Sequence, residues 1–339
     1  MRLTFSHHNI LYKLAIWLIA MWIVVGCSSS LSPTPTMSPA TSTPTQEPPA
    51  TPTLTTVPAT STTTQESPAT PSSPAKTATL TTEVTRGIVY TNVDTLRTEL
   101  DVYAPNEPGP WPVVVVTHGV AQNRHHFTDL AEAIASQGSV VYNIDVMFTI
   151  PYRPSFERIA CAVRFARTTA ADYGGDPSSI TLVGNSAGAS TGVVVALAGD
   201  DFEGDCVVTE GSALLNALVG FEGDYDYPYT FYPDEWDHTY LKDEDPELWH
   251  AINPYSHIGR NPELQIRLVY GDEVDPAWYD VQPEVAMEFH QALVEAGYDV
   301  ELIFVEGASH TDLTNQSHSS DAFAITVELV MELARAPSQ

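Results

Sequence analysis

The chain has 339 residues, and its 43 Asp and Glu residues against 14 Lys and Arg residues give a formal net charge of −29. Residues 1–83 contain equal numbers of basic and acidic side chains, so the whole excess belongs to residues 84–339. Such an acidic surface repels nucleic acid and anionic lipid headgroups, and no nucleic-acid partner is expected. Residues 84–339 have the length of one α/β domain with a core of its own.

The first residues have the pattern of an export signal. A basic start precedes a short apolar run over residues 14–25, which is typical of a secretory signal peptide. The end of this run, Val-Val-Gly-Cys at residues 24–27, resembles the bacterial lipobox, in which a signal peptidase cuts before a cysteine that is then diacylated. We therefore expect a lipoprotein signal peptide at residues 1–26 and a membrane-anchored protein outside the cytoplasm, lipidated at Cys27. The alternative is an uncleaved membrane anchor, for which the run is near the minimum length.

Residues 27–83 are dominated by Thr, Pro, Ser and Ala. A segment with so little apolar surface cannot offset the entropy lost on folding. Proline-rich chains of this kind are extended. The composition predicts a disordered tether between the membrane anchor and the domain at residues 84–339.

From residue 84 onward, the hydrophobic patterns predict alternating strands and helices. The first two strands form a hairpin, and the apolar run at residues 113–117 is typical of a strand that is buried on both faces. Strands are predicted at residues 86–91, 98–103, 113–117, 139–145, 180–183, 206–209, 265–270 and 300–305, and helices at residues 127–137, 155–173, 187–198, 284–296 and 321–334. This alternation predicts an α/β domain with a mostly parallel sheet that is covered by helices on both faces.

Residues 221–257 interrupt the alternation. They contain four prolines and many aromatic side chains. Long irregular segments in compact domains often serve as lids or binding loops, so this segment is predicted to form a cap or lid. The alternative is a surface excursion with a small core of its own.

A candidate nucleophile lies between a predicted strand and a predicted helix. Residues 184–188 read Gly-Asn-Ser-Ala-Gly, a G-x-S-x-G motif, directly after the strand at 180–183. On such a turn the serine hydroxyl is held exposed, and the flanking glycines leave room for the sharp bend. Ser186 is therefore predicted to be a nucleophile, and a serine hydroxyl needs a neighbouring base.

His310 is the preferred base because it follows the last predicted strand, in the loop Gly-Ala-Ser-His at residues 307–310. The preferred acid is Asp275, in the segment after the strand at residues 265–270. Asp272 is the second choice and Asp280 the third. A carboxylate there would orient the imidazole and stabilise its cation.

The oxyanion of an acyl-transfer reaction needs two backbone N–H groups. One is expected from Ala187, immediately after the nucleophile. The other is expected from Val120, in the loop His-Gly-Val-Ala at residues 118–121 after the strand at 113–117.

These segments resemble the carboxylesterase and lipase branch of the α/β-hydrolases, and the resemblance extends over nearly all of residues 85–335. It rests on the stretch at residues 161–188 and on the segments after the last two strands. The resemblance implies an eight-stranded α/β-hydrolase fold and a Ser186–Asp275–His310 triad that cleaves a small-molecule ester through an acyl-enzyme. It implies no metal and no organic cofactor. Esterases similar to hormone-sensitive lipase have His-Gly-Gly-Gly where this chain has His-Gly-Val-Ala.

Two other functions are compatible with the same residues. A peptidase or another acyl hydrolase on this fold would use the same triad, and a non-catalytic binding lipoprotein would keep the fold without the reaction. With Cys27 assigned to lipid, Cys161 and Cys206 remain, and in an exported domain they either form a disulfide or stay as two separate thiols.

Overall fold

Eight strands form one sheet in the part of the chain that the computed structural model describes, namely residues 79–93, 98–148, 153–226, 245–273 and 283–336. Their order across the sheet is β1-β2-β4-β3-β5-β6-β7-β8. The pairs β1–β2 and β2–β4 are antiparallel, and the other five pairs are parallel. The strands are β1 (Thr82–Val89), β2 (Glu99–Pro105), β3 (Trp111–Thr117), β4 (Val140–Ile144), β5 (Gly175–Asn185), β6 (Ala217–Phe221), β7 (Gln265–Gly271) and β8 (Asp299–Val305).

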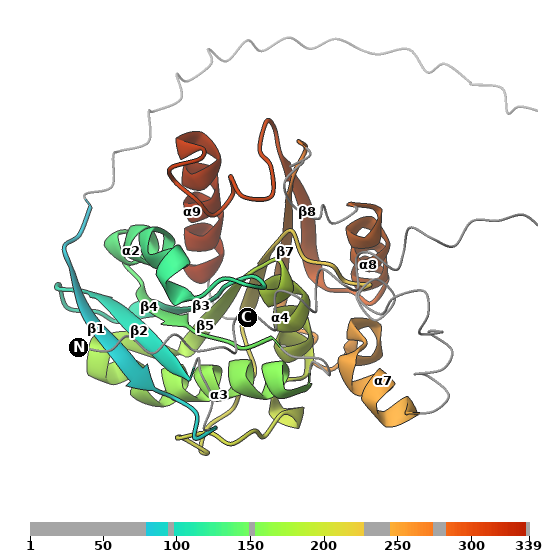
Figure 1. The fold of residues 1–339 in the computed structure, drawn as a ribbon, viewed down its shortest axis with the longest axis horizontal. Helices are drawn as coiled ribbons and strands as arrows, with labels where there is room; N and C mark the ends of the chain where they lie inside the picture. Colours follow the sequence, from blue (N-terminus) through green and yellow to red (C-terminus); the bar gives the residue numbers. More distant parts are fainter. Residues whose placement is uncertain (1–78, 94–97, 149–152, 227–244, 274–282, 337–339) are drawn as a thin grey trace, which may run out of the picture. The chain divides into compact units, whose positions relative to one another are not determined.

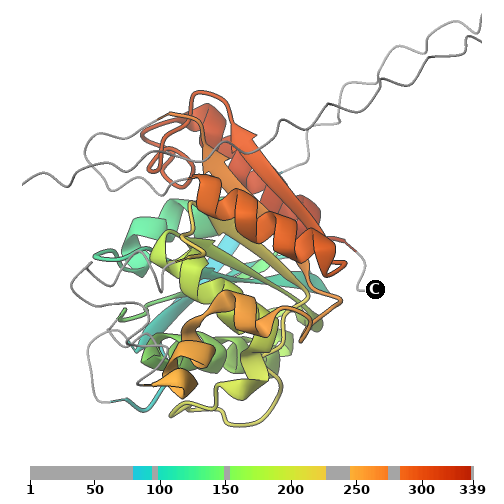
Figure 2. The same cartoon turned by 90° about the vertical axis from the view of Figure 1, so that its right-hand side faces the viewer.

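Helices cover both faces of this sheet (Figure 1). On one face, α2 and α9 pack against the strands around Leu130 and Val330. On the other face, α3, α4 and α8 enclose the larger core around Phe156 and Phe289. In the second view, α8 lies in front of β7 and β8, and α9 lies behind them (Figure 2). The α-helices are α2 (Thr128–Ser136), α3 (Arg153–Thr169), α4 (Ala187–Ala198), α7 (Pro246–Ile252), α8 (Pro283–Glu295) and α9 (Ser320–Ala334), and the 3-10 helices are η1 (Arg124–Phe127), η2 (Ala170–Tyr173), η3 (Gly199–Asp201) and η4 (Pro254–His257).

The predicted α/β-hydrolase architecture, with a mostly parallel sheet of about eight strands, is thus confirmed. Helix α4 illustrates why the pattern was readable. Every residue from Ala187 to Ala198 is buried, and the sequence there is apolar or small all round, as a helix enclosed on all sides requires. None of the helices in the described ranges is long and apolar enough to cross a membrane.

Two strand assignments were wrong. Residues 206–209 form no strand, since Cys206 makes one isolated bridge with Thr91 and Val207 is exposed. The strand that lies between β5 and β7 is instead β6, Ala217–Phe221, whose five residues are all buried. It was missed because its last residue, Phe221, was assigned to the aromatic cap.

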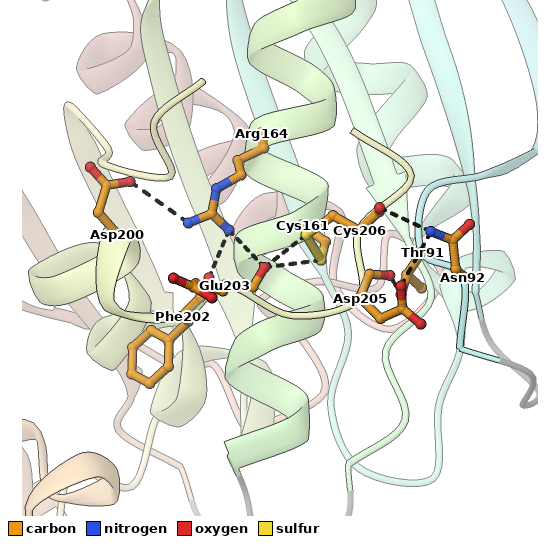
Figure 3. Close-up of a disulfide and its surroundings, with 9 residues drawn as sticks. All are labelled: Thr91, Asn92, Cys161, Arg164, Asp200, Phe202, Glu203, Asp205 and Cys206. Atoms are coloured by element: carbon orange, nitrogen blue, oxygen red, sulfur yellow. Dashed lines mark hydrogen bonds and ion pairs between the residues drawn. A yellow bond between two sulfur atoms is a disulfide. The ribbon is translucent and has the colours of Figure 1, made fainter. Parts of the chain in front are cut away.

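A disulfide joins Cys161 of α3 to Cys206, with 5.1 Å between the two Cα atoms (Figure 3). The loop that carries Cys206 is also held by Arg164, whose guanidinium donates to the carbonyls of Phe202 at 2.7 Å and Glu203 at 3.3 Å. Beyond the disulfide, Asn92 donates to the Cys206 carbonyl at 3.0 Å. Of the two alternatives for these cysteines, the structure therefore has the disulfide.

Several predictions concern residues outside the described ranges. These are the signal peptide, the tether up to residue 78, the lipidation site Cys27, the acid candidates Asp275 and Asp280, and residues 227–244 of the cap. The last residues of the predicted tether are described and already belong to the domain, since Leu80 donates its N–H to the Ser136 carbonyl at 2.7 Å and β1 begins at Thr82. The described part of the predicted cap includes α7 and η4. Ile252 of α7 belongs to the larger core, which anchors this end of the segment on the domain. A lid function stays a prediction.

Candidate active site

Ser186 lies on a sharp turn between β5 and α4. Its backbone has φ 52° and ψ −122°, a left-handed conformation that costs a non-glycine residue about 1–3 kcal/mol. The flanking glycines permit this turn. A Cβ on Gly184 would lie 2.5 Å from the Gly188 carbonyl oxygen, and one on Gly188 would lie 2.5 Å from that of His118. The turn thus has the geometry that exposes a nucleophilic hydroxyl.

The loop after β3 lies beside this turn and is anchored to the segment after β4 by a buried histidine. His118 Nε2 accepts a hydrogen bond from the Val146 N–H at 3.0 Å, so the ring proton is on Nδ1, which faces the Gly119 carbonyl at 2.8 Å. A Cβ on Gly119 would lie 3.2 Å from Ser186 Cβ, so the loop packs directly on the predicted nucleophile.

The same loop carries Val120, from which the second oxyanion donor is expected. Gly119 donates its N–H to Gln122 Oε1 at 2.9 Å, so this N–H is already engaged. Val120 is the next residue, and it lines the same cavity as Ser186 and Ala187. The two residues predicted to supply the oxyanion donors are therefore brought together beside Ser186.

His310 is placed by the loop between β8 and α9, and its side chain is buried. This loop passes close to the end of β7. A Cβ on Gly271 would lie 2.1 Å from the Ala308 carbonyl oxygen, so Gly271 permits the close approach. Within the loop, Ser309 donates both its N–H and its hydroxyl to the Asp312 carboxylate, at 2.8 and 2.7 Å.

The four predicted site residues that the structure describes all line one cavity of about 170 Å³. It lies at the carboxyl ends of the parallel strands, where open α/β sheets bind ligands. The surface that lines it is more apolar than polar, and the lining residues are Gly119, Val120, Gln122, His126, Phe127, Asn185, Ser186, Ala187, Ser190, Asp224, His310, Thr311, Thr314 and Asn315. Within the described ranges, no group of three or more His, Cys, Asp or Glu side chains is placed to hold a metal ion.

The carboxylates near His310 differ from the expectation. The second-choice acid, Asp272, accepts a hydrogen bond from the Gly307 N–H at 2.6 Å and so connects the two loops. A residue that the sequence analysis did not consider, Glu222, has its Oε2 3.7 Å from His310 Nδ1. Its signal in the sequence is an acidic residue directly after the apolar run at residues 217–221, which is the end of β6.

Buried tyrosines pack behind Glu222. Burial raises the pKa values of Tyr225 and Tyr270, so both hydroxyls are neutral at physiological pH. Tyr270 donates its hydroxyl to the Gly223 carbonyl. The segment after β6 is therefore fixed to β7 by side-chain as well as backbone contacts.

Comparison with known proteins agrees with this geometry. The chain is 28% identical over 254 residues to a probable isoprenylcysteine alpha-carbonyl methylesterase, ICMEL1, of Arabidopsis thaliana, which covers 68% of this chain and 51% of that protein. It is 28% identical over 171 residues to Esterase LipQ of Mycobacterium tuberculosis, which covers 48% of this chain and 38% of LipQ. The chain thus spans about half the length, or less, of these two curated relatives.

Among solved structures, the butyrate-bound form of the thermophilic esterase Est2 of Thermogutta terrifontis has a TM-score of 0.56 and 22% identity, and covers 76% of this chain and 94% of that chain. This likeness shows the shared fold. The BD-FAE family matches residues 100–273, about half of the chain, and this range includes the turn at Ser186 and Glu222. The chain therefore belongs to the BD-FAE family, an esterase family of the α/β-hydrolase fold.

Proposed function

We propose that the chain is a serine esterase that cleaves carboxylic esters through an acyl-enzyme. The observation that carries this proposal is the strained turn at Ser186, which faces the same cavity as His310. His310 takes the proton of the Ser186 hydroxyl, whose oxygen then bonds to the ester carbonyl carbon. The alcohol leaves with the proton from His310, and a water activated by His310 releases the acid.

The negative charge of the tetrahedral intermediate is held by the N–H groups of Val120 and Ala187. Their place beside Ser186 supports this role, as does the engagement of the Gly119 N–H by Gln122. Asp275, the acid predicted from the sequence, lies outside the described residues, so its part in the triad stays a prediction.

The substrate that fits this site is a small ester. The cavity of about 170 Å³ is smaller than the roughly 300–1,000 Å³ of sites that enclose drug-sized ligands, and its lining exposes more apolar than polar surface. The names of the related proteins point the same way. Est2 was solved with butyrate, and ICMEL1 is named a probable methylesterase. We propose that a short acyl or alcohol group enters the cavity.

The first test is to treat the full-length chain with a fluorophosphonate probe and to locate the adduct by mass spectrometry. Labelling at Ser186 that is lost in His310→Ala is expected. Turnover of p-nitrophenyl acetate, butyrate and octanoate should fall by at least about a thousandfold in Ser186→Ala. Turnover by a folded Ser186→Ala protein at the wild-type rate would reject the proposal, and faster cleavage of peptide anilides than of esters would indicate a peptidase.

We also propose that the enzyme acts outside the cytoplasm on a lipid anchor at Cys27. The disulfide between Cys161 and Cys206 supports an oxidising compartment, because cytosolic thiols are kept reduced. A clickable palmitate analogue should label the wild-type chain in a bacterial host, and Cys27→Ala should lose both the label and the membrane association. Equal labelling of the two proteins would contradict the anchor.

A further inference from the structure

We propose that Glu222, at the end of β6, is the carboxylate that orients His310, in the role that the sequence analysis assigned to Asp275. The inference rests on the proposed function, because orienting a histidine matters only if His310 is the base. Glu222 is a positioning residue, since it acts on the reaction through the imidazole.

The first observation is the pairing itself. Glu222 Oε2 lies 3.7 Å from His310 Nδ1, and both residues are less than a tenth exposed. Nδ1 is buried and has no hydrogen-bond partner among the described residues, so the carboxylate meets an unsatisfied donor. A separation of 3.7 Å is longer than a hydrogen bond, and such contacts in unliganded sites tighten when the substrate binds. A carboxylate at Nδ1 leaves Nε2 to take the serine proton.

The second observation is that Glu222 is held rigidly in this place. Its N–H donates to the Val269 carbonyl at 2.9 Å, and its Oε1 accepts from the Gly271 N–H at 2.6 Å. One carboxylate oxygen is therefore bound to the end of β7, and the other oxygen faces the histidine. A carboxylate that merely tied two strands together would not need a buried histidine against its second oxygen.

The third observation is backbone strain. Within the described ranges, three non-glycine residues have positive φ, namely Ala121 at 60°, Ser186 at 52° and Glu222 at 52°. The first follows Val120 in the predicted oxyanion loop, and the second is the nucleophile. Non-glycine residues in this conformation persist where the surrounding structure imposes them, and they cluster at functional sites. Glu222 shares this property with the machinery around the cavity.

The end of β6 thereby connects two parts of the site. The carbonyl of Phe221 accepts a hydrogen bond from the Ser186 N–H at 2.8 Å, and the next residue is Glu222. One strand end fixes the nucleophile through its backbone and the base through its side chain. Asp272 has no such position, because it is exposed and its Oδ1 accepts from the Gly307 N–H.

The test compares three substitutions in the full-length chain: Glu222→Gln, Asp275→Asn and, as a matched control, Asp272→Asn. Glutamine keeps an oxygen that accepts the Gly271 N–H but removes the charge that faces His310, so Glu222→Gln isolates that contact. We expect kcat to fall by about 10³–10⁴-fold in Glu222→Gln with KM little changed, as when the orienting acid of a triad becomes an amide. Asp272→Asn should keep most of its activity, and the Asp275→Asn loss should be smaller than the Glu222→Gln loss.

The balance between kcat and stability separates positioning from simple structural support. A residue that only supports the fold would lower the melting temperature and the fraction of folded protein, whereas loss of the positioning contact lowers kcat in a protein whose melting temperature and KM are little changed. A larger loss in Asp275→Asn than in Glu222→Gln would overturn the inference. So would a Glu222→Gln protein whose melting temperature falls while the folded molecules keep the wild-type kcat. Failure of the proposed function is distinguishable, because Ser186→Ala would then remain active whatever Glu222→Gln does.

Discussion

Replacing both Cys161 and Cys206 by alanine should lower the free energy of unfolding by about 4 kcal/mol. The bridge joins residues 45 apart in the sequence. The chain-entropy relation for a closed loop of that length gives roughly 4 kcal/mol at 25 °C. Such a loss is a large share of the roughly 5–15 kcal/mol by which typical domains are stable. At about 2–4 °C for each kcal/mol, the melting temperature should fall by roughly 8–16 °C.

The loss should act mainly through the unfolded chain. In the folded state, the loop that carries Cys206 keeps other attachments, since the buried guanidinium of Arg164 donates to the Phe202 and Glu203 carbonyls and Asn92 donates to the Cys206 carbonyl. Neither cysteine lines the cavity that holds Ser186. Ester turnover at 25 °C should therefore be unchanged in the double variant.

Urea unfolding of the full-length chain measures this difference. The wild type in a strong reductant is the matched control, because it loses the same bridge without any substitution. Reductant should destabilise the wild type and leave the double variant unaffected. A destabilisation below about 1 kcal/mol, or a loss of turnover in a protein that is still folded, would refute the reasoning.

Three further predictions follow from single contacts. In Gly271→Ala the added Cβ would lie 2.1 Å from the Ala308 carbonyl oxygen, so the loop that carries His310 must move. Ester turnover should fall at least about tenfold, and the free energy of unfolding, measured by thermal unfolding, should fall by about 1–3 kcal/mol. A fully active variant would contradict this prediction. His118→Phe leaves the buried Val146 N–H without its acceptor, so the free energy of unfolding should fall by about 1–3 kcal/mol. The variant should lower kcat more than it raises KM. An unchanged kcat would argue against a role for this loop. Burial lowers the pKa of His257, so the unfolded chain binds the extra proton first. The free energy of unfolding should then fall as pH decreases through about 6.5. In His257→Gln, the melting temperature should depend less on pH between pH 7.5 and 5.5 than in the wild type. Melting temperatures of the two proteins that fall in parallel over this range would exclude His257 as the cause.

Most of the sheet and the strand-to-helix turn at Ser186 could be predicted because their signals are local. The valine run of β3 is buried on both faces, so its sequence is continuously apolar and readable without the rest of the chain. The turn at Ser186 is equally local, since the glycines that flank it make room for close backbone contacts that a side chain would prevent. The bounds of α4 agree with the prediction because the motif marks its start.

The disulfide could not be predicted, because it depends on two segments meeting in space. Cys161 lies on a helix and Cys206 in a loop, and no periodicity relates them. The residues around Cys206 include two valines and a threonine, whose β-branched side chains favour a strand. That preference failed because the segment pairs with another chain segment at one residue, Thr91. The β propensity of these residues does not form a strand without a longer pairing partner.

The missed strand β6 and the missed residue Glu222 have one cause, and this cause affects the assignment of function. Phe221 is apolar and precedes many aromatic residues, so composition assigned it to the cap, although it is a fully buried strand residue. Once the strand was missed, its last residue could not be recognised as a strand end, and the acidic residue that follows it, Glu222, was not considered. In a parallel sheet, the carboxyl ends of neighbouring strands are where side chains from distant segments converge on one ligand. Strand assignment and site assignment are therefore the same problem in this fold, and the substitution of Glu222 tests both together.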